Sequence, residues 1–181
     1  MEAYTRMKSG RPVLCVNDAE ILYGSWSNFA GVNNMGQEVM KFFNIKVDPE
    51  CVQAISDYGL EAKWYERDGI YHLKCNLSWR FGDPEVYLIA SNGIMTELTE
   101  QMVADLQNRR NIDHVDFEAT KSFWKNDMNG TSGWSAYANS VHIYLCGPTE
   151  PERRYQERFG NTQQPEPVQM ALFPDEDDIP F

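Results

Sequence analysis

The sequence has little that would place it in a membrane, a disulfide framework or a zinc knuckle. No run of eighteen or more apolar residues occurs, which excludes a membrane-spanning helix. The four cysteines lie far apart with no Cys-x-x-Cys pair, so reduced thiols in a cytoplasmic protein are the simplest interpretation. Arg6, Lys8 and Arg11 open the chain, but no apolar block follows them, and no secretory signal is expected.

Arrangements typical of catalytic sites are also lacking. The stretch 130–133 contains two glycines but no lysine, and it has no strand-to-helix setting, so it is not a phosphate-binding loop. His72 and His142 are predicted on outer faces of strands, and no nucleophile–histidine arrangement can be read. Asp116 and Glu118 share one strand face, where solvated carboxylates explain them better than a metal does. We expect no enzymatic activity, no metal and no cofactor.

Basic residues are scarce relative to acidic ones. The 181 residues include 16 Lys and Arg against 27 Asp and Glu, for a formal net charge of −11. From Glu150 onward 8 residues are acidic and 3 are basic, and neither Lys nor Arg occurs from Asn161 to the last residue. The preceding part is mildly acidic too, which argues against binding DNA by charge alone.

Proline marks a change of organisation near residue 147. Six of the 9 prolines lie beyond residue 146, and the segment 163–167 cannot hold a regular helix or a paired strand. Hydrophobic residues make up 42% of the chain, enough to form a core. We therefore predict a folded domain over 1–147 and a flexible Pro-rich acidic tail over 148–181, with a short helix near 153–158 and disorder from 161.

The folded part is predicted to be mainly β. Asp48 and Pro49 open a helix that Gly59 ends, and Asp68-Gly69 is a typical hairpin turn. Because most connections are short turns and only two helices are expected, a small barrel is favoured over a doubly wound sheet. The predicted helices are 48–59 and 99–109, and the predicted strands are 13–16 and 19–26 (with a bulge near 17–18), 38–47, 61–65, 70–79, 85–90, 114–124 and 134–145.

Alternation along the strands separates a core face from an outer face. Aromatic and basic side chains share the outer face, an arrangement typical of a platform on which bases stack while cations contact phosphates. The alternative is that Phe42 and Trp124 pack beneath a helix or a loop. Inward positions are predicted for Phe43, Ile45, Val47, Leu73, Cys75, Leu77, Met102, Val103, Leu106, Val115, Phe117, Ala119 and Phe123.

The last five residues are the most specific motif. They are Asp177, Asp178, Ile179, Pro180 and Phe181, an acidic run that ends in an aliphatic residue, a proline and an aromatic residue. Such a tip suits a shallow apolar pocket ringed by cations. It resembles the protein-docking tail of bacterial single-stranded DNA-binding proteins. This resemblance implies that replication and repair proteins are partners of the tail.

The preceding domain resembles a phage-encoded group of single-stranded DNA-binding proteins with an OB-fold. The matching stretches are 27–31, 41–47, 85–90, 123–125 with 129–130, and 134–144. The resemblance implies an OB-fold-like five-stranded barrel that binds single strands without sequence preference in DNA replication, recombination or repair, in a bacterial or phage-infected cytoplasm. The DNA-binding residues that it implies are Phe29, Phe42, Lys46, Lys74, Arg80, Trp124 and Lys125. The basic loop of that group is replaced here by residues 32–37, which are uncharged.

A second short segment in the tail is similar to the pentapeptide that binds the bacterial sliding clamp. Gln169 would supply hydrogen bonds while Leu172 and Phe173 enter an apolar pocket, although a chance match explains five residues equally well. A competing function is a non-enzymatic adaptor or decoy that mimics the tail of a host protein, and the acidic composition favours it. The sequence leaves open the oligomeric state and the choice between DNA and RNA.

Overall fold

The computed structural model describes residues 1–80, 82–109 and 111–147. The whole predicted tail, with its docking residues and its clamp-like segment, lies outside the described residues. The helices in the described part are α1 (Val52–Tyr58) and α2 (Glu100–Ala104), with 3-10 turns at Gly24–Trp26, Pro49–Cys51 and Asp105–Asn108. The strands are β1 (Glu2–Lys8), β2 (Arg11–Ala19), β3 (Ile21–Leu22), β4 (Lys41–Val47), β5 (Lys63–Tyr65), β6 (Ile70–Leu77), β7 (Glu85–Ile89), β8 (Met95–Glu97), β9 (Ile112–Asn126) and β10 (Thr131–Leu145).

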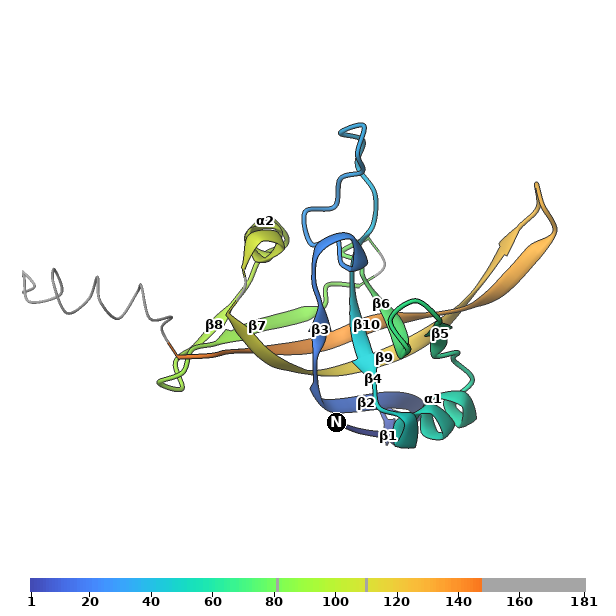
Figure 1. Ribbon diagram of the computed structural model, residues 1–181, viewed down its shortest axis with the longest axis horizontal. Coiled ribbons are helices and arrows are strands. Elements are labelled where there is room, and N and C mark those ends of the chain that lie inside the picture. The colour runs from blue at the N-terminus through green and yellow to red at the C-terminus, as the bar shows by residue number, and fades with distance from the viewer. Residues whose placement is uncertain (81, 110, 148–181) are drawn as a thin grey trace, which may run out of the picture. The chain divides into compact units, whose positions relative to one another are not determined.

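The main strands form a barrel (Figure 1). They pair in the order β1-β2-β9-β10-β6-β4-β3, and β2 and β3 are two halves of one chain stretch. Because β2 pairs with β9 while β3 pairs with β4, this stretch closes the sheet on itself. β10 pairs with β6 in parallel, and the other barrel pairs are antiparallel. The predicted mainly β fold, an OB-like five-stranded barrel with two helices, is confirmed.

The barrel closes at a predicted irregularity. Asp18 has a left-handed backbone (φ 55°), and the pairing with β9 shifts register between Val16 and Ala19. A bulge of this kind bends a strand and increases its twist, which lets one stretch serve two partners. The strand ends at Leu22, earlier than predicted, because the chain turns there and the Ser27 hydroxyl donates to the Leu22 carbonyl over 2.6 Å.

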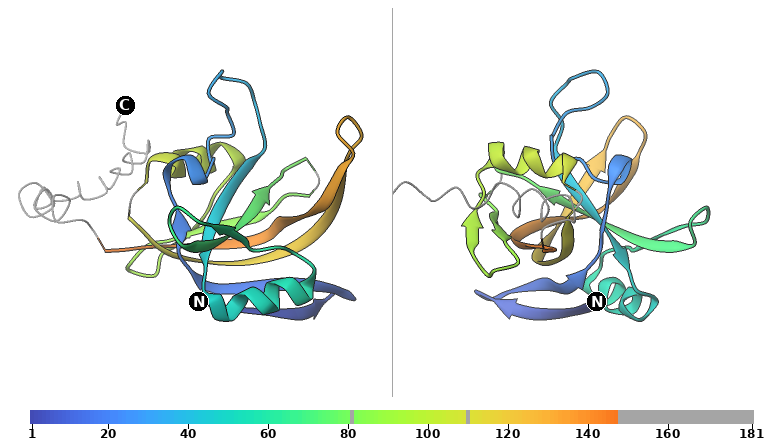
Figure 2. Two further views of the ribbon diagram at one scale, coloured as in Figure 1. Left: turned by 45° about the vertical axis from the view of Figure 1, so that its right-hand side comes forward. Right: turned by 60° about the vertical axis from the view of Figure 1, so that its left-hand side comes forward.

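Helix α1 ends as predicted, and the helical segment begins with the 3-10 turn Pro49–Cys51. Gly59 adopts the left-handed conformation (φ 88°) that glycine reaches without strain, and its N–H closes the last turn. As predicted, Asp48 occupies the N-cap position and Pro49 comes first in the helical segment, but the Asp48 side chain makes no capping hydrogen bond. The Asp48 carboxylate instead lies 3.2 Å from the amine of Met1. Ile55 and Tyr58 are buried, and α1 lies beside β1 in Figure 2.

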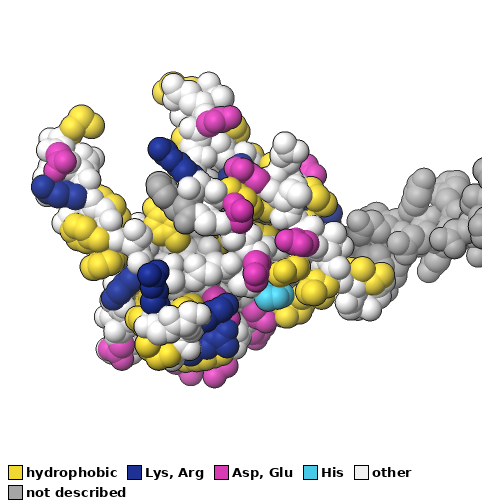
Figure 3. Space-filling view, turned by 180° about the vertical axis from the view of Figure 1, so that it is seen from behind, with side chains coloured by type: hydrophobic (Ala, Val, Ile, Leu, Met, Phe, Trp, Pro, Cys, Tyr) yellow, Lys and Arg dark blue, Asp and Glu magenta, His cyan; other side chains and the backbone are white. Residues whose placement is uncertain are grey.

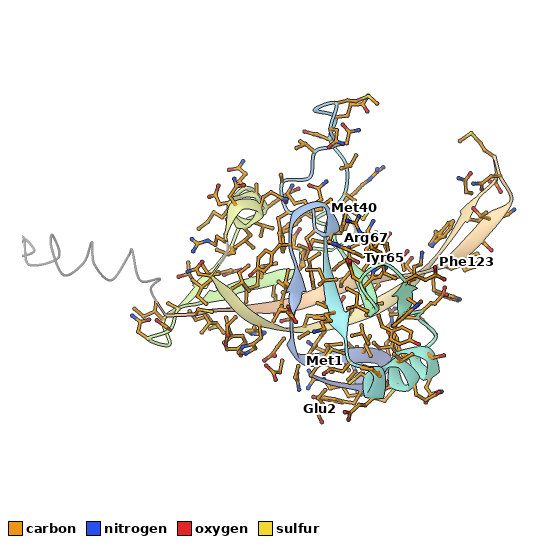
Figure 4. The ribbon with its side chains drawn as sticks, in the orientation of Figure 1. Met1, Glu2, Met40, Tyr65, Arg67 and Phe123 are labelled. Atoms are coloured by element: carbon orange, nitrogen blue, oxygen red, sulfur yellow. The ribbon has the colours of Figure 1, made fainter. Side chains whose placement is uncertain are left out.

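The core follows the predicted alternation with two exceptions. The inward positions of β4 and β6 are buried, as are Val115, Phe117 and Ala119 of β9. Phe123 was predicted inward but is 55% exposed, because β9 and β10 continue past the barrel as a projecting hairpin (Figures 1 and 4). Met102 is exposed as well, whereas Val103 and Leu106 pack inward from the same helical region.

Further strands extend the sheet outside the barrel. β1 was not predicted, because its side chains are mostly exposed and lack a buried alternation; it forms a hairpin with β2 through Ser9-Gly10. β5 pairs with β6, while β7 pairs in parallel with the second half of β10 and carries β8 at its edge. Of the helices in the described ranges, none is both long and apolar enough to cross a bilayer.

Candidate nucleic-acid interface

A groove of about 1080 Å³ runs along the outer side of β4 and β6. The loop before β4, the end of α1 and the projecting hairpin of β9 and β10 form its walls, and Figure 4 labels Met40 on that loop. Its lining residues are Ser25, Trp26, Met40, Phe42, Asn44, Ser56, Gly59, Leu60, Glu61, Lys63, His72, Leu73, Lys74, Asn76, Trp124, Ser132, Gly133, Trp134, Ser135, Ala136 and Tyr137.

Aromatic rings line the groove from three different elements. Trp26 comes from the loop, Phe42 from β4, and Trp124, Trp134 and Tyr137 from the hairpin. Trp124 is 43% exposed and Trp134 is 51% exposed. Large apolar rings with this much open surface can take further flat partners, which is what base stacking requires.

Two lysines give the groove a local positive charge. The ammonium of Lys74 lies 3.8 Å from the centre of the Phe42 ring, and Lys63 stands on the neighbouring strand. Burial lowers the pKa of Lys74, and the nearby charge of Lys63 lowers it further. A phosphate beside these amines would offset the repulsion between their charges. Among the described lining residues Glu61 is the one carboxylate, so the chain's acidity lies mostly outside the groove.

The loop before β4 is held against the barrel by a small polar and aromatic cluster. The ring of Trp26 packs in edge-to-face geometry on His72 and Tyr65, with ring centres 5.0 Å and 4.7 Å apart respectively. The Asn44 amide donates to the Trp26 carbonyl, and its oxygen lies 3.2 Å from Nδ1 of His72. Desolvation lowers the pKa of His72, and the charge of Lys63 contributes, so the neutral form is favoured. These contacts fix Trp26 at the groove wall.

The projecting hairpin is fixed in a similar way. The Trp124 ring lies across Gly133 on the opposite strand, within 3.2 Å of where a Cβ would stand. On the other face the Lys121 ammonium donates to the Tyr58 carbonyl over 2.6 Å and lies 5.1 Å from the Trp134 ring centre. The hairpin is thus tied to the end of α1, and both tryptophans keep defined positions.

Three of the seven predicted DNA-binding residues, Phe42, Lys74 and Trp124, meet in this groove. Lys46 follows Phe42 on β4 but pairs with Glu20 at 3.4 Å. Lys125 pairs with Asp127 at 2.9 Å near the hairpin tip, and Arg80 is exposed in the loop after β6. These three basic residues do not line the groove.

Phe29 requires a correction. Its side chain is 2% exposed and stacks on Phe43 in the core, with ring centres 6.2 Å apart. Its backbone N–H donates to the Gln107 side-chain oxygen over 2.7 Å. The ring therefore holds the loop to the barrel and is not open to a base in this structure.

The groove residues that were not predicted to contact DNA include Trp26, Lys63, Trp134 and Tyr137. A signal for Trp134 was available, since Trp124 ends one predicted strand and Trp134 begins the next. Trp26 and Lys63 carried no periodic signal, because a loop and a three-residue strand present them.

Metal chemistry finds no support in the described ranges, where no group of three or more His, Cys, Asp and Glu side chains could hold an ion. The groove offers stacking surfaces and cations, which suit binding.

Neither a protein family model nor a curated protein sequence matches the chain. Solved structures do. A C-terminally truncated single-stranded DNA-binding protein from bacteriophage Enc34 shares 12% identity, covers 81% of this chain and 96% of its own, and gives a TM-score of 0.48. The same phage protein in complex with single-stranded DNA gives 12% identity, 74% and 86% coverage and a TM-score of 0.45. The single-stranded DNA-binding protein gp2.5 of bacteriophage T7 shares 11% identity, covers 80% of this chain and 93% of its own, and gives a TM-score of 0.38.

Proposed function

We propose that the chain binds single-stranded DNA in this groove, without sequence preference. The observation that carries the proposal is the meeting of Phe42, Trp124 and Trp134 with Lys63 and Lys74 in one groove. The groove runs along the second and third barrel strands, β4 and β6, and is bordered by the loop between β3 and β4 and by the hairpin of β9 and β10. This is the region that OB-folds use for oligonucleotides.

Single strands fit this chemistry better than duplexes do. Exposed rings gain roughly 1–3 kcal/mol for each base that stacks on them, and only an unpaired strand offers free base faces. A duplex offers mainly phosphates, and a chain with a net charge of −11 and two groove lysines has little to bind them with.

Tryptophan fluorescence of the full chain tests the proposal. We expect quenching by an oligothymidine, weaker quenching at higher salt, and little response to a duplex of equal length. The double variant Phe42→Ala/Trp124→Ala should lose most of the affinity for the oligothymidine. Trp64→Ala is the matched control, because Trp64 is 52% exposed but packs on Tyr71 outside the groove. A flat titration of the unmodified chain, or equal losses in control and double variant, would contradict the proposal.

The tail has its own proposed role, the recruitment of replication and repair proteins through Asp177–Phe181. Its support is the sequence resemblance, since this segment lies outside the described residues. The acidic composition also supports the adaptor or decoy. Removing Phe181 should abolish partner binding under both functions. Phe42→Ala/Trp124→Ala should impair only a DNA-binding protein, so the adaptor would show unchanged activity with that variant.

A further inference from the structure

A second pocket of about 520 Å³ lies beyond the groove, on the other side of Tyr137. Tyr137 lines both hollows, so a strand leaving the groove along this ring reaches the pocket directly. The pocket is lined by Ser78, Gly82, Asp83, Pro84, Thr120, Ser122, Phe123, Tyr137, Ala138 and Asn139. The loop after β6 and the central parts of β9 and β10 contribute these residues.

The two hollows differ in charge. The groove contains Lys63 and Lys74, whereas the pocket has neither lysine nor arginine among its described lining residues and carries the Asp83 carboxylate. The pocket's remaining polar groups are hydroxyls and an amide. Such a lining repels a phosphate but can hydrogen-bond the edge of a neutral base. The chemistry thus favours a nucleobase over the sugar-phosphate backbone.

A β-bulge helps to build the pocket. The pairing of β9 with β10 shifts register between Ala138 and Ser140, which leaves Asn139 opposite no residue. The Asn139 oxygen accepts from the Thr120 hydroxyl over 3.2 Å. Bulges of this kind redirect side chains and occur beside functional sites. Here the redirected amide lies in the pocket wall beside the hydroxyl groups.

Phe123 supplies an apolar rim. Its ring is 55% exposed and meets Trp134, which belongs to the groove, edge-on at 5.3 Å. Viewed from behind, the hairpin that carries Phe123 stands away from the body (Figure 3). An aromatic ring of the pocket rim is therefore in contact with an aromatic ring of the groove.

We propose that this pocket takes one unstacked base of the bound strand and prefers a base with an exocyclic amine. The Asp83 carboxylate accepts hydrogen bonds only, and cytosine offers it an N4 amine where thymine offers an O4 acceptor. The proposal deepens the proposed function and rests on it. It adds a preference for cytosine over thymine to a groove that is otherwise indifferent to sequence.

The test compares an oligodeoxycytidine with an oligothymidine of equal length, titrated against the full chain in slightly alkaline buffer. We expect the cytidine strand to bind roughly fivefold more tightly, as expected from one added carboxylate–amine hydrogen bond. Asp83→Ala should bring the ratio of the two dissociation constants close to one. Glu85→Ala is the matched control, since it removes a nearby exposed carboxylate outside the pocket and should leave the ratio unchanged.

A second variant tests the pocket without changing the loop that carries Asp83. Ser122→Trp places a ring in the pocket from an exposed strand position and should abolish the preference while oligothymidine binding persists. A ratio near one in the unmodified chain, or a ratio that survives both variants, overturns the pocket's role. If the unmodified chain binds neither strand, the proposed function itself has failed, so the two failures are distinguishable.

Discussion

The ammonium of Lys74 lies 3.8 Å from the centre of the Phe42 ring, on the outer face of two paired strands. Phe42 pairs with Asn76 and Asn44 pairs with Lys74, so the cation and the ring are diagonal neighbours across β4 and β6. The contact holds a positive charge beside a surface on which a base can stack. Base and phosphate of one nucleotide therefore find their partners within a single side-chain pair.

Replacing Lys74 should change the salt dependence of DNA binding. Each phosphate contact on a single strand contributes about −0.7 to the slope of log affinity against log salt. Lys74→Gln should therefore weaken binding at low salt and make the slope shallower by about 0.7. Titrations of an oligothymidine at several salt concentrations measure this change. Lys8→Gln is the control, because Lys8 pairs with Glu118 on β9, outside the groove. The slope of log affinity against log salt measured with this variant should match that of the unmodified chain.

Adding a methyl group under Trp124 should weaken binding without unfolding the chain. A Cβ at Gly133 would lie 3.2 Å from the Trp124 ring, closer than ordinary contact. The ring must tilt in Gly133→Ala, and we expect several-fold weaker binding of an oligothymidine together with a changed tryptophan emission. Thr131→Ser is the control: Thr131 is exposed and lies outside the groove, so losing its methyl group should leave both readouts as they are. Unchanged affinity in Gly133→Ala would mean that the ring position does not matter.

Substitutions at Phe29 and Phe42 should have different effects, the first on the free energy of unfolding and the second on DNA affinity. Phe29→Leu shrinks a buried side chain and should lower the free energy of unfolding by roughly 1–2 kcal/mol, with oligothymidine affinity preserved. Phe42→Leu removes a groove ring and should give the opposite pattern, since Phe42 is only half-buried. Urea denaturation and anisotropy titration of both variants measure the two quantities. A Phe29→Leu chain that folds normally but loses DNA affinity would restore Phe29 as a contact.

The sequence carried enough information for the barrel but not for its edges. Alternation identified β4, β6 and β9 because each buries one face, and the bulge at Asp18 followed from the polar break in an apolar run. β1 was not recognised because a strand at the edge of the sheet buries little and shows no alternation. Its position depends on pairing with β2, which is a tertiary interaction.

The groove could be predicted only where a regular strand presents its residues. The outward positions of Phe42 and Lys74 followed from strand alternation, and the resemblance implied their contact with DNA. Phe29 lies in a loop, where no alternation reveals that it points inward. The prediction that Phe123 points inward was wrong for another reason: alternation along a strand does not show where the strand leaves the barrel. Beyond that point both faces of the hairpin meet solvent, and this is where Trp134 becomes available to the groove.

His72 should make the free energy of unfolding depend on pH. Its pKa in the folded chain is lowered by desolvation and by Lys63, below the ordinary value of 6.5. The unfolded chain therefore binds the extra proton first, so stability is retained above pH 6.5 and is lost as the pH falls through the lower, folded-state pKa. Comparing urea midpoints of the unmodified chain and His72→Gln over this range isolates the effect. The unmodified chain should lose more stability on acidification; parallel curves would remove His72 as the cause.

Lys121 should stabilise the chain and the hairpin together. Its ammonium donates to the Tyr58 carbonyl at the end of α1, where a positive charge is favourable, and also faces the rings of Tyr58 and Trp134. Lys121→Met keeps the apolar stem and should cost about 1 kcal/mol in urea denaturation, because the group is only half-buried. Lys125→Met, which breaks only the exposed contact with Asp127, should cost less than about 0.5 kcal/mol. Lys121→Met should also weaken oligothymidine binding several-fold, since Trp134 loses a contact that holds it in the groove wall. A stability loss with unchanged affinity would show that the hairpin keeps its position without α1.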